Sequence, residues 1–121
     1  MSKNVQTTKD ALILSKAVKR AAEFLGVSKD TLSSILSIQT SQLEPVLKLG
    51  IDPKTKQGER SLIFINVYTR LAALSGGDEM FIKHFMQTDN RYFEAKPIDV
   101  MKSAEGLERV HHYLIAMGSK H

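Results

Sequence analysis

The sequence predicts an all-α fold, in which a small N-terminal helix-turn-helix bundle precedes a C-terminal helical domain. Apolar residues recur at spacings of three and four along most of the chain, as one face of an α-helix requires. Residues that begin or end helices, such as Gly26, Ser28 and Asp78, separate these apolar segments. Residues 50–58, which contain two glycines and a proline, are predicted to form a linker. We therefore expect two units, residues 1–57 and residues 58–121.

The first helix is predicted from about Asp10 to Leu25, because its apolar residues share one face and its charged residues lie outside. The polar residues 1–8 are expected to be frayed. Gly26 is suited to end this helix in a left-handed conformation. Ser28 can then cap a second helix that continues to Leu36.

Residues 28–47, SKDTLSSILSIQTSQLEPVL, have the apolar spacing of a helix-turn-helix motif. Ser33 is small where the two helices would cross, and Ser37 stands at the turn, where the backbone often needs a positive φ. The start of the second helix would read base edges in DNA, and nearby lysines would hold phosphates. The candidate DNA-binding residues are Lys29, Gln39, Thr40, Ser41, Gln42 and Lys48.

Glu44 and Pro45 argue against strong DNA binding. Glu44 would place a negative charge on the helix that should meet phosphates. Pro45 would remove a hydrogen bond inside the helix, at a cost of about 3 kcal/mol. Either the recognition helix starts late, near Pro45, or it is short and distorted. The alternative is a helical bundle that keeps the packing of the motif without binding DNA.

The net charge of +4 belongs entirely to the first half of the chain. Residues 1–57 carry nine Lys/Arg and five Asp/Glu, whereas residues 58–121 carry eight of each. This imbalance favours nucleic acid as the partner of the first half and protein as the partner of the second. A solvated lysine-rich surface explains the charge equally well.

Composition excludes several classes of protein. The chain has no run of 18 apolar residues, which a membrane-spanning helix would need. The N-terminus lacks the apolar core of a signal peptide. The chain has no cysteine, which excludes disulfides and thiolate metal sites and is typical of a cytoplasmic protein. We therefore expect a cytoplasmic protein without a membrane segment.

The sequence offers no set of residues that would support catalysis. His111 and His112 are adjacent, so on a helix their side chains point about 100° apart and do not easily chelate one metal. Glu105 and Glu108 lie on the outer side of a predicted helix, as a solvated face does. There is no P-loop and no glycine-rich dinucleotide motif. We predict no catalytic residue, no metal, no cofactor and no enzyme activity.

The second half begins with a strongly apolar predicted helix, Glu59 to Leu74, which the Ser75-Gly76-Gly77 segment ends. Because this helix is apolar nearly all round, we expect it to be central or to be covered by a second subunit. The residues expected to face inwards are Leu62, Ile65, Val67, Leu71 and Leu74.

Three further helices are predicted, one before and two after a loop at residues 88–96 that contains the aromatic pair Tyr92 and Phe93. Asp78 caps a helix at about residues 79–87, and the residues expected to face inwards are Met80, Phe81, Phe85 and Ile82. Pro97 suits the start of a short helix, and Ser103 caps a final amphipathic helix. The inward stripe of this last helix is Leu107, Val110, Leu114 and Met117.

The second half resembles the toxin-binding domain of the MbcA/ParS/Xre antitoxins, which typically follows a helix-turn-helix. Here Ala21 to Lys48 would be that helix-turn-helix, and Glu94-Ala95 stands where the family commonly has two glycines. The matching stretches are Gly58-Glu59-Arg60-Ser61, the apolar helix to Leu74, Gly76-Gly77-Asp78-Glu79, residues 88–93, residues 97–101, residues 106–110 and residues 113–117.

The resemblance implies a cytoplasmic bacterial antitoxin that dimerises and binds a toxin of the RES class. Such toxins consume NAD or use it to modify proteins, and the antitoxin blocks the NAD site with its C-terminal segment. Many of these antitoxins also repress their own operon by binding operator DNA. The implied toxin-binding residues are Glu108, Arg109, His112, Tyr113, Gly118, Ser119, Lys120 and His121. The alternative is a stand-alone helix-turn-helix transcription regulator without a toxin partner.

Overall fold

The computed structural model describes the backbone of residues 2–118 and the side chains from Lys9 onwards. This part of the chain forms helices and a single isolated bridge between Asn90 and Ala95, which confirms the all-α prediction. The helices are α1 (Ser2–Leu25), α2 (Lys29–Leu36), α3 (Thr40–Leu49), α4 (Lys56–Ser75), α5 (Glu79–Gln87), α6 (Pro97–Val100) and α7 (Ala104–Gly118).

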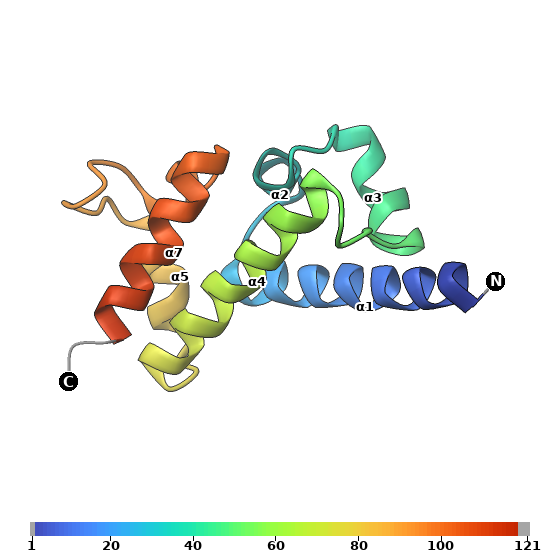
Figure 1. The fold of residues 1–121 in the computed structure, drawn as a ribbon. Coiled ribbons are helices and arrows are strands. Elements are labelled where there is room, and N and C mark those ends of the chain that lie inside the picture. Colours follow the sequence, from blue (N-terminus) through green and yellow to red (C-terminus); the bar gives the residue numbers. More distant parts are fainter. Residues whose placement is uncertain (1, 119–121) are drawn as a thin grey trace.

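Helix α4 joins the two halves of the molecule (Figure 1). The long helix α1 packs against α3, α4 and α5, while α2 and α3 lie together beside the start of α4. Helix α7 packs along α4, and the short α6 connects α5 to α7. The described ends of the chain lie on opposite sides of the molecule (Figure 1).

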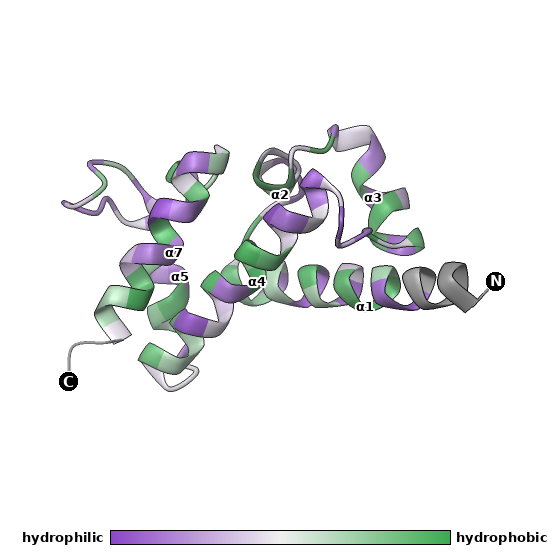
Figure 2. Ribbon diagram, viewed as in Figure 1, coloured by the Kyte–Doolittle hydropathy of each residue, from purple (hydrophilic) through white to green (hydrophobic). Residues whose placement is uncertain are grey.

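The buried apolar residues form one cluster that crosses the expected boundary after residue 57. It includes Val18 and Leu25 of α1, Ile35 of α2, Phe64 of α4 and Leu114 of α7. In Figure 2 the long helices show hydrophobic residues interspersed with hydrophilic ones, as amphipathic helices do. The two expected units share this core, and their division into functional parts stays a prediction.

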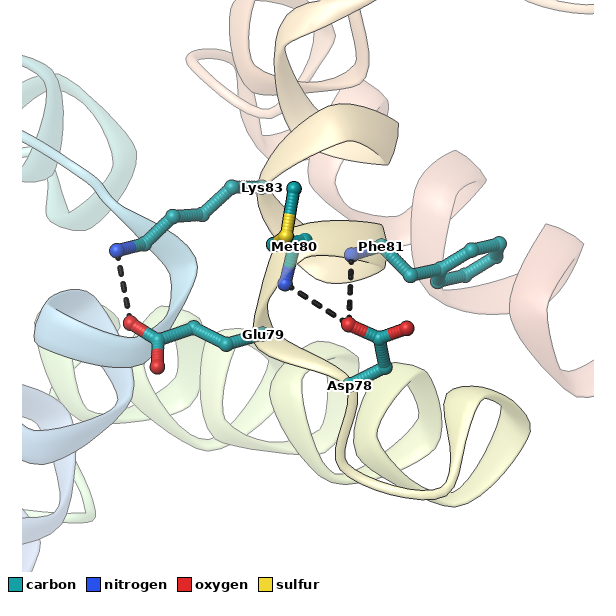
Figure 3. Close-up of polar contacts among 5 residues, drawn as sticks. All are labelled: Asp78, Glu79, Met80, Phe81 and Lys83. Atoms are coloured by element: carbon teal, nitrogen blue, oxygen red, sulfur yellow. Dashed lines mark hydrogen bonds and ion pairs between the residues drawn. The ribbon is translucent and has the colours of Figure 1, made fainter.

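The predicted turn and capping residues adopt the expected conformations. Gly26 has a φ of 71° and Ser37 a φ of 61°, both in the left-handed region. Ser28 and Ser103 each accept a hydrogen bond from a backbone N–H in the first turn of the helix that follows. Asp78 Oδ1 accepts from the N–H groups of Met80 at 3.0 Å and Phe81 at 3.3 Å, which fixes the start of α5 (Figure 3).

Two helix starts differ from the prediction. Helix α1 begins at Ser2, ahead of the predicted start at Asp10. Helix α4 begins at Lys56 rather than Glu59, because Thr55 Oγ1 accepts a hydrogen bond from the N–H of Gly58 at 3.1 Å. Residues 56–58, the end of the predicted linker, therefore belong to the first turn of α4.

The predicted inward faces of α4 and α5 are partly wrong. Leu62 and Leu74 are exposed, whereas Phe64 is fully buried. The reason is that α4 packs against α1 and α7 without being covered all round. Met80 and Phe81 are also exposed, because the short α5 buries only Ile82 and Met86, which lie one turn apart. The last helix buries Leu107, Val110 and Leu114 as predicted but leaves Met117 exposed.

Candidate functional site

Helices α2 and α3 meet across a short turn at Ser37, whose left-handed backbone lets the N–H of Ile38 donate to the Ser33 carbonyl at 2.9 Å. Leu36 and Leu43 are buried between the helices and the rest of the core. The turn leaves the side chains at the start of α3 in solvent, namely Gln39, Thr40, Ser41 and Gln42.

The structure does not bring all six candidate DNA-binding residues together. Gln39 to Gln42 lie at the N-terminal end of α3, next to an open groove of about 440 Å³ that α3 forms with residues 50–57. Lys48 lies in the last turn of the same helix. A DNA backbone that contacts Lys48 would therefore pass the C-terminal end of α3, away from Gln39 to Gln42.

Lys29 forms an ion pair with Glu44, with Nζ and Oε1 3.1 Å apart. Both side chains are exposed, and an exposed pair of this kind contributes less than about 1 kcal/mol. A phosphate could therefore displace Glu44 from Lys29 at small cost, although the carboxylate would still repel it.

Helix α3 does not start late at Pro45. It begins at Thr40 and contains Pro45 near its middle, so the predicted late start is wrong and the alternative of a short helix holds. Pro45 is exposed, and its missing N–H leaves the Ser41 carbonyl, one turn earlier, without that intrahelical donor. Solvent at this exposed face can hydrate the carbonyl, which lowers the cost of the proline.

The candidate toxin-binding residues of α7 form one continuous arc on its outer side. Successive residues of an α-helix are about 100° apart, so Glu108, His112, Arg109 and Tyr113 follow one another in that order within about 140°. The first three are exposed and Tyr113 is half-buried. The buried stripe of α7 occupies the opposite side of the helix, so it anchors this arc to α4.

Glu108 lies at one edge of the arc, in a groove of about 420 Å³ between the first turns of α4 and α7. The groove also contains Lys56, Glu59 and Arg60. Because these residues start both helices, α4 and α7 run in the same direction.

Tyr113, at the other edge of the arc, belongs to an aromatic cluster that the sequence did not reveal. Its ring centroid is 6.3 Å from that of Phe85, 5.2 Å from that of Tyr92 and 5.1 Å from that of Phe93. The guanidinium carbon of Arg109 lies 5.4 Å from the centroid of the Phe93 ring, within the range of a cation–π contact. The cluster joins α5, the loop at residues 88–96 and α7.

The loop at residues 88–96 is held in a defined turn. Asn90 Oδ1 accepts a hydrogen bond from the N–H of Tyr92 at 2.8 Å, and the N–H of Asn90 donates to the Ala95 carbonyl at 3.0 Å. Glu94 has a φ of 59°, the left-handed region that glycine adopts most easily. The resembling family commonly has two glycines at the positions of Glu94 and Ala95, and here Glu94 itself adopts the left-handed conformation.

A family comparison bears on the C-terminal part of the molecule. Residues 70–120 match the family model of the antitoxin Xre/MbcA/ParS C-terminal toxin-binding domain. This segment is an antitoxin toxin-binding domain. The match begins within α4, includes α5, α6 and α7, and leaves out the candidate DNA-binding residues. No curated protein matches the chain in sequence.

The match supports an antitoxin role for the chain, with a toxin as its partner. The outer arc of α7 and the aromatic cluster both lie inside the matched residues. Within residues 2–118, no helix is long and apolar enough to span a membrane. Among the side chains that the structure describes, no three His, Asp or Glu residues are grouped so as to hold a metal ion.

His111 of α7 is half-buried. Burial, followed by the charges of His112 and Arg70, lowers the pKa of His111, and Glu108 only partly opposes this. These surroundings favour the neutral imidazole of His111. Gly118 is the last residue of α7, and the candidates Ser119, Lys120 and His121 lie outside the described residues.

Proposed function

We propose that this chain is the antitoxin of a RES-type toxin that consumes NAD, and that it blocks the toxin by covering the NAD-binding site. The observation that supports this most is the match of residues 70–120 to an antitoxin toxin-binding domain. The RES class and the NAD site come from the resemblance carried by segments such as Gly58-Glu59-Arg60-Ser61 and residues 106–110.

In this proposal the outer arc of α7 contacts the toxin and the residues after it enter the mouth of the NAD site. Arg109 and His112 are exposed and lie on the side of α7 that faces away from α4. Ser119, Lys120 and His121 follow Gly118, the last residue of α7, in the sequence. Arg109, together with Lys120, would supply positive charge toward a pocket that binds the pyrophosphate of NAD.

A deletion of residues 118–121 tests the covering role without removing any buried residue of α7. We expect the shortened chain still to bind the proposed RES toxin but to inhibit its NAD consumption at least about tenfold less well, a difference of about 1.4 kcal/mol. NAD consumption by the purified toxin is measured against increasing antitoxin. Full inhibition by the shortened chain would contradict the covering role.

We also propose that the first half binds operator DNA and that the protein acts as a homodimer. The exposed side chains at the start of α3 and the positive charge of residues 1–57 support DNA binding. Exposed apolar residues on α1 and α4, such as Ile13 and Leu62, support contact with a second copy. The alternative of a regulator without a toxin partner rests on the same first half.

The ion pair between Lys29 and Glu44 gives a sharp test of DNA binding. Glu44→Gln removes a negative charge from α3 and releases Lys29, so we expect the affinity for the upstream DNA to rise about three- to tenfold. A gel shift at low and moderate salt measures this. Glu79→Gln, which breaks the comparable Glu79–Lys83 pair on α5, is the control and should leave DNA affinity unchanged. Equal effects of the two substitutions would refute a specific DNA surface on α2 and α3.

A further inference from the structure

The toxin-binding domain has a row of large apolar side chains, of which Phe93 is buried and the others reach the surface. Three ring contacts centred on Tyr113 tie it to Phe85, Tyr92 and Phe93. Phe81 and Met117 extend the row, as the helix geometry shows. We call this set the apolar strip: Phe81, Phe85, Tyr92, Phe93, Tyr113 and Met117.

The direction of the helices places Phe81 and Met117 at the same end of the strip. Helices α4 and α7 run in the same direction, and α5 turns back from the end of α4, so α5 begins at the end where α7 finishes. Phe81 lies one turn before Phe85 on α5, and Met117 lies one turn after Tyr113 on α7. In Figure 3 the Phe81 side chain points from α5 toward α7. The strip therefore runs from the loop at residues 88–96 to the last turn of α7.

Much of the strip is in contact with solvent. Tyr92 is 64% exposed, Phe81 is 48% exposed and Met117 is 43% exposed. Single exposed apolar residues are ordinary on a protein surface, but a connected group that includes aromatic rings is typical of an interface. Tyrosine, phenylalanine, methionine and arginine are also enriched in the centres of protein interfaces, and Arg109 borders the strip at Phe93.

The anchors of the strip are held in place before any partner binds. The Asp78 cap fixes the first turn of α5, which presents Phe81 (Figure 3). The hydrogen bond from the N–H of Tyr92 to Asn90 Oδ1 fixes the turn that presents Tyr92. Preformed anchors lose little conformational entropy on binding, which favours tight association. The carboxylate of Glu79, next to the cap, is already paired with Lys83 at 2.9 Å, so it adds little unpaired charge beside the strip.

We infer that the apolar strip is the surface on which the toxin docks, with Phe81, Tyr92 and Met117 inserted into the toxin. This inference rests on the proposed antitoxin function. All six strip residues fall within residues 70–120, the segment that matches a toxin-binding domain. Other exposed apolar residues of similar size, such as Ile13 and Leu49, lie outside that segment. A second copy of the chain could bind there without covering the strip. Tyr113 belongs both to the strip and to the outer arc of α7, so one toxin can cover both.

Alanine substitutions in the full-length chain test the strip. We expect Phe81→Ala and Tyr92→Ala each to raise the Kd for the purified proposed RES toxin at least about tenfold, and the double variant about a hundredfold. Tyr92→Phe should keep most of the affinity, because it retains the ring. Leu49→Ala is the matched control, since Leu49 is 75% exposed on α3, and it should change the Kd less than about twofold. Titration calorimetry measures the Kd, and thermal melting confirms that each variant is folded.

The other possible results of these experiments refute either the strip as the docking surface or the proposed antitoxin function. Equal effects of the strip variants and the Leu49 control would overturn the strip as the docking surface. A change from dimer to monomer in Phe81→Ala or Tyr92→Ala, seen by sedimentation, would assign the strip to a second copy instead. If the unsubstituted chain does not bind the toxin, the proposed function fails and the strip loses its assigned partner. If the unsubstituted chain binds while the strip variants bind equally well, only the strip is refuted.

Discussion

Gly106→Ala is expected to lower the free energy of unfolding by about 3 kcal/mol or more. A Cβ at Gly106 would overlap the carbonyl oxygen of Val100 and would lie 2.9 Å from Ser103 Oγ. The first neighbour is backbone, so it can move only if the junction of α6 and α7 shifts. That junction also contains the Ser103 cap, whose Oγ accepts from the N–H of Gly106 at 3.0 Å.

Thermal melting of the full-length chain measures this effect, and we expect the melting temperature to fall by roughly 10 °C or more. Gly118→Ala is the matched control, because no atom lies within 4 Å of a Cβ built at Gly118. This control should be neutral or slightly stabilising, since alanine favours a helix over glycine. A melting temperature for Gly106→Ala equal to that of the control would show that α6 and α7 do not pack as closely as described.

Arg60→Ala is expected to destabilise the protein by about 2–3 kcal/mol, because one side chain holds two parts of the fold together. Arg60 Nε donates to the Ile35 carbonyl at 2.6 Å, and Nη2 donates to the carbonyls of Ser34 at 3.4 Å and Lys102 at 3.3 Å. The first two carbonyls belong to the last turn of α2, and the third belongs to the segment before α7. Burial lowers the pKa of Arg60, but an arginine keeps its positive charge at neutral pH.

Urea unfolding of Arg60→Ala, Arg60→Lys and the exposed control Arg20→Ala separates these contributions. Lysine keeps the charge but has a single ammonium group, so it cannot reproduce the planar fork and should recover only part of the stability. Arg20→Ala should change stability by less than about 0.5 kcal/mol. Full stability in Arg60→Lys would mean that charge alone, and not the set of hydrogen bonds, accounts for the role of Arg60.

The sequence predicted the beginnings and ends of most helices because these depend on local chemistry. Ser28, Asp78 and Ser103 accept hydrogen bonds from the N–H groups of the turn that follows, and such caps require only a few neighbouring residues. The left-handed turn at Ser37 was predicted for the same reason. The missed start of α4 at Lys56 is also local, since Thr55 is a capping residue, but the nearby proline and glycines favoured a linker there.

The Gly58-Glu59-Arg60-Ser61 segment shows what a sequence motif leaves out. The sequence identified it only as a point of resemblance. In the structure, Gly58 approaches the backbone carbonyl of Asp52 so closely that a Cβ would overlap it. Arg60 binds three distant carbonyls, and the buried Ser61 donates to the Gln57 carbonyl at 2.6 Å. The Ser61 bond is local to α4, whereas the requirements at Gly58 and Arg60 depend on contacts with other segments, which periodicity does not reveal.

The candidate site was predicted only in part for the same reason. Helical spacing correctly placed Glu108, Arg109 and His112 on the exposed side of α7. It could not show that Tyr113 meets Phe85 and Tyr92, which come from a different helix and from a loop. The apolar composition of α5 also favoured burial of Phe81, although a helix of nine residues can bury only one narrow face.

We propose that this chain neutralises a RES-class toxin through its C-terminal domain. NAD consumption by the purified proposed toxin, followed while the full-length chain is added in increasing amounts, tests this proposal. We expect NAD consumption to fall to the background rate as the antitoxin reaches stoichiometric amounts. NAD consumption that continues unchanged in excess antitoxin would refute neutralisation by this chain.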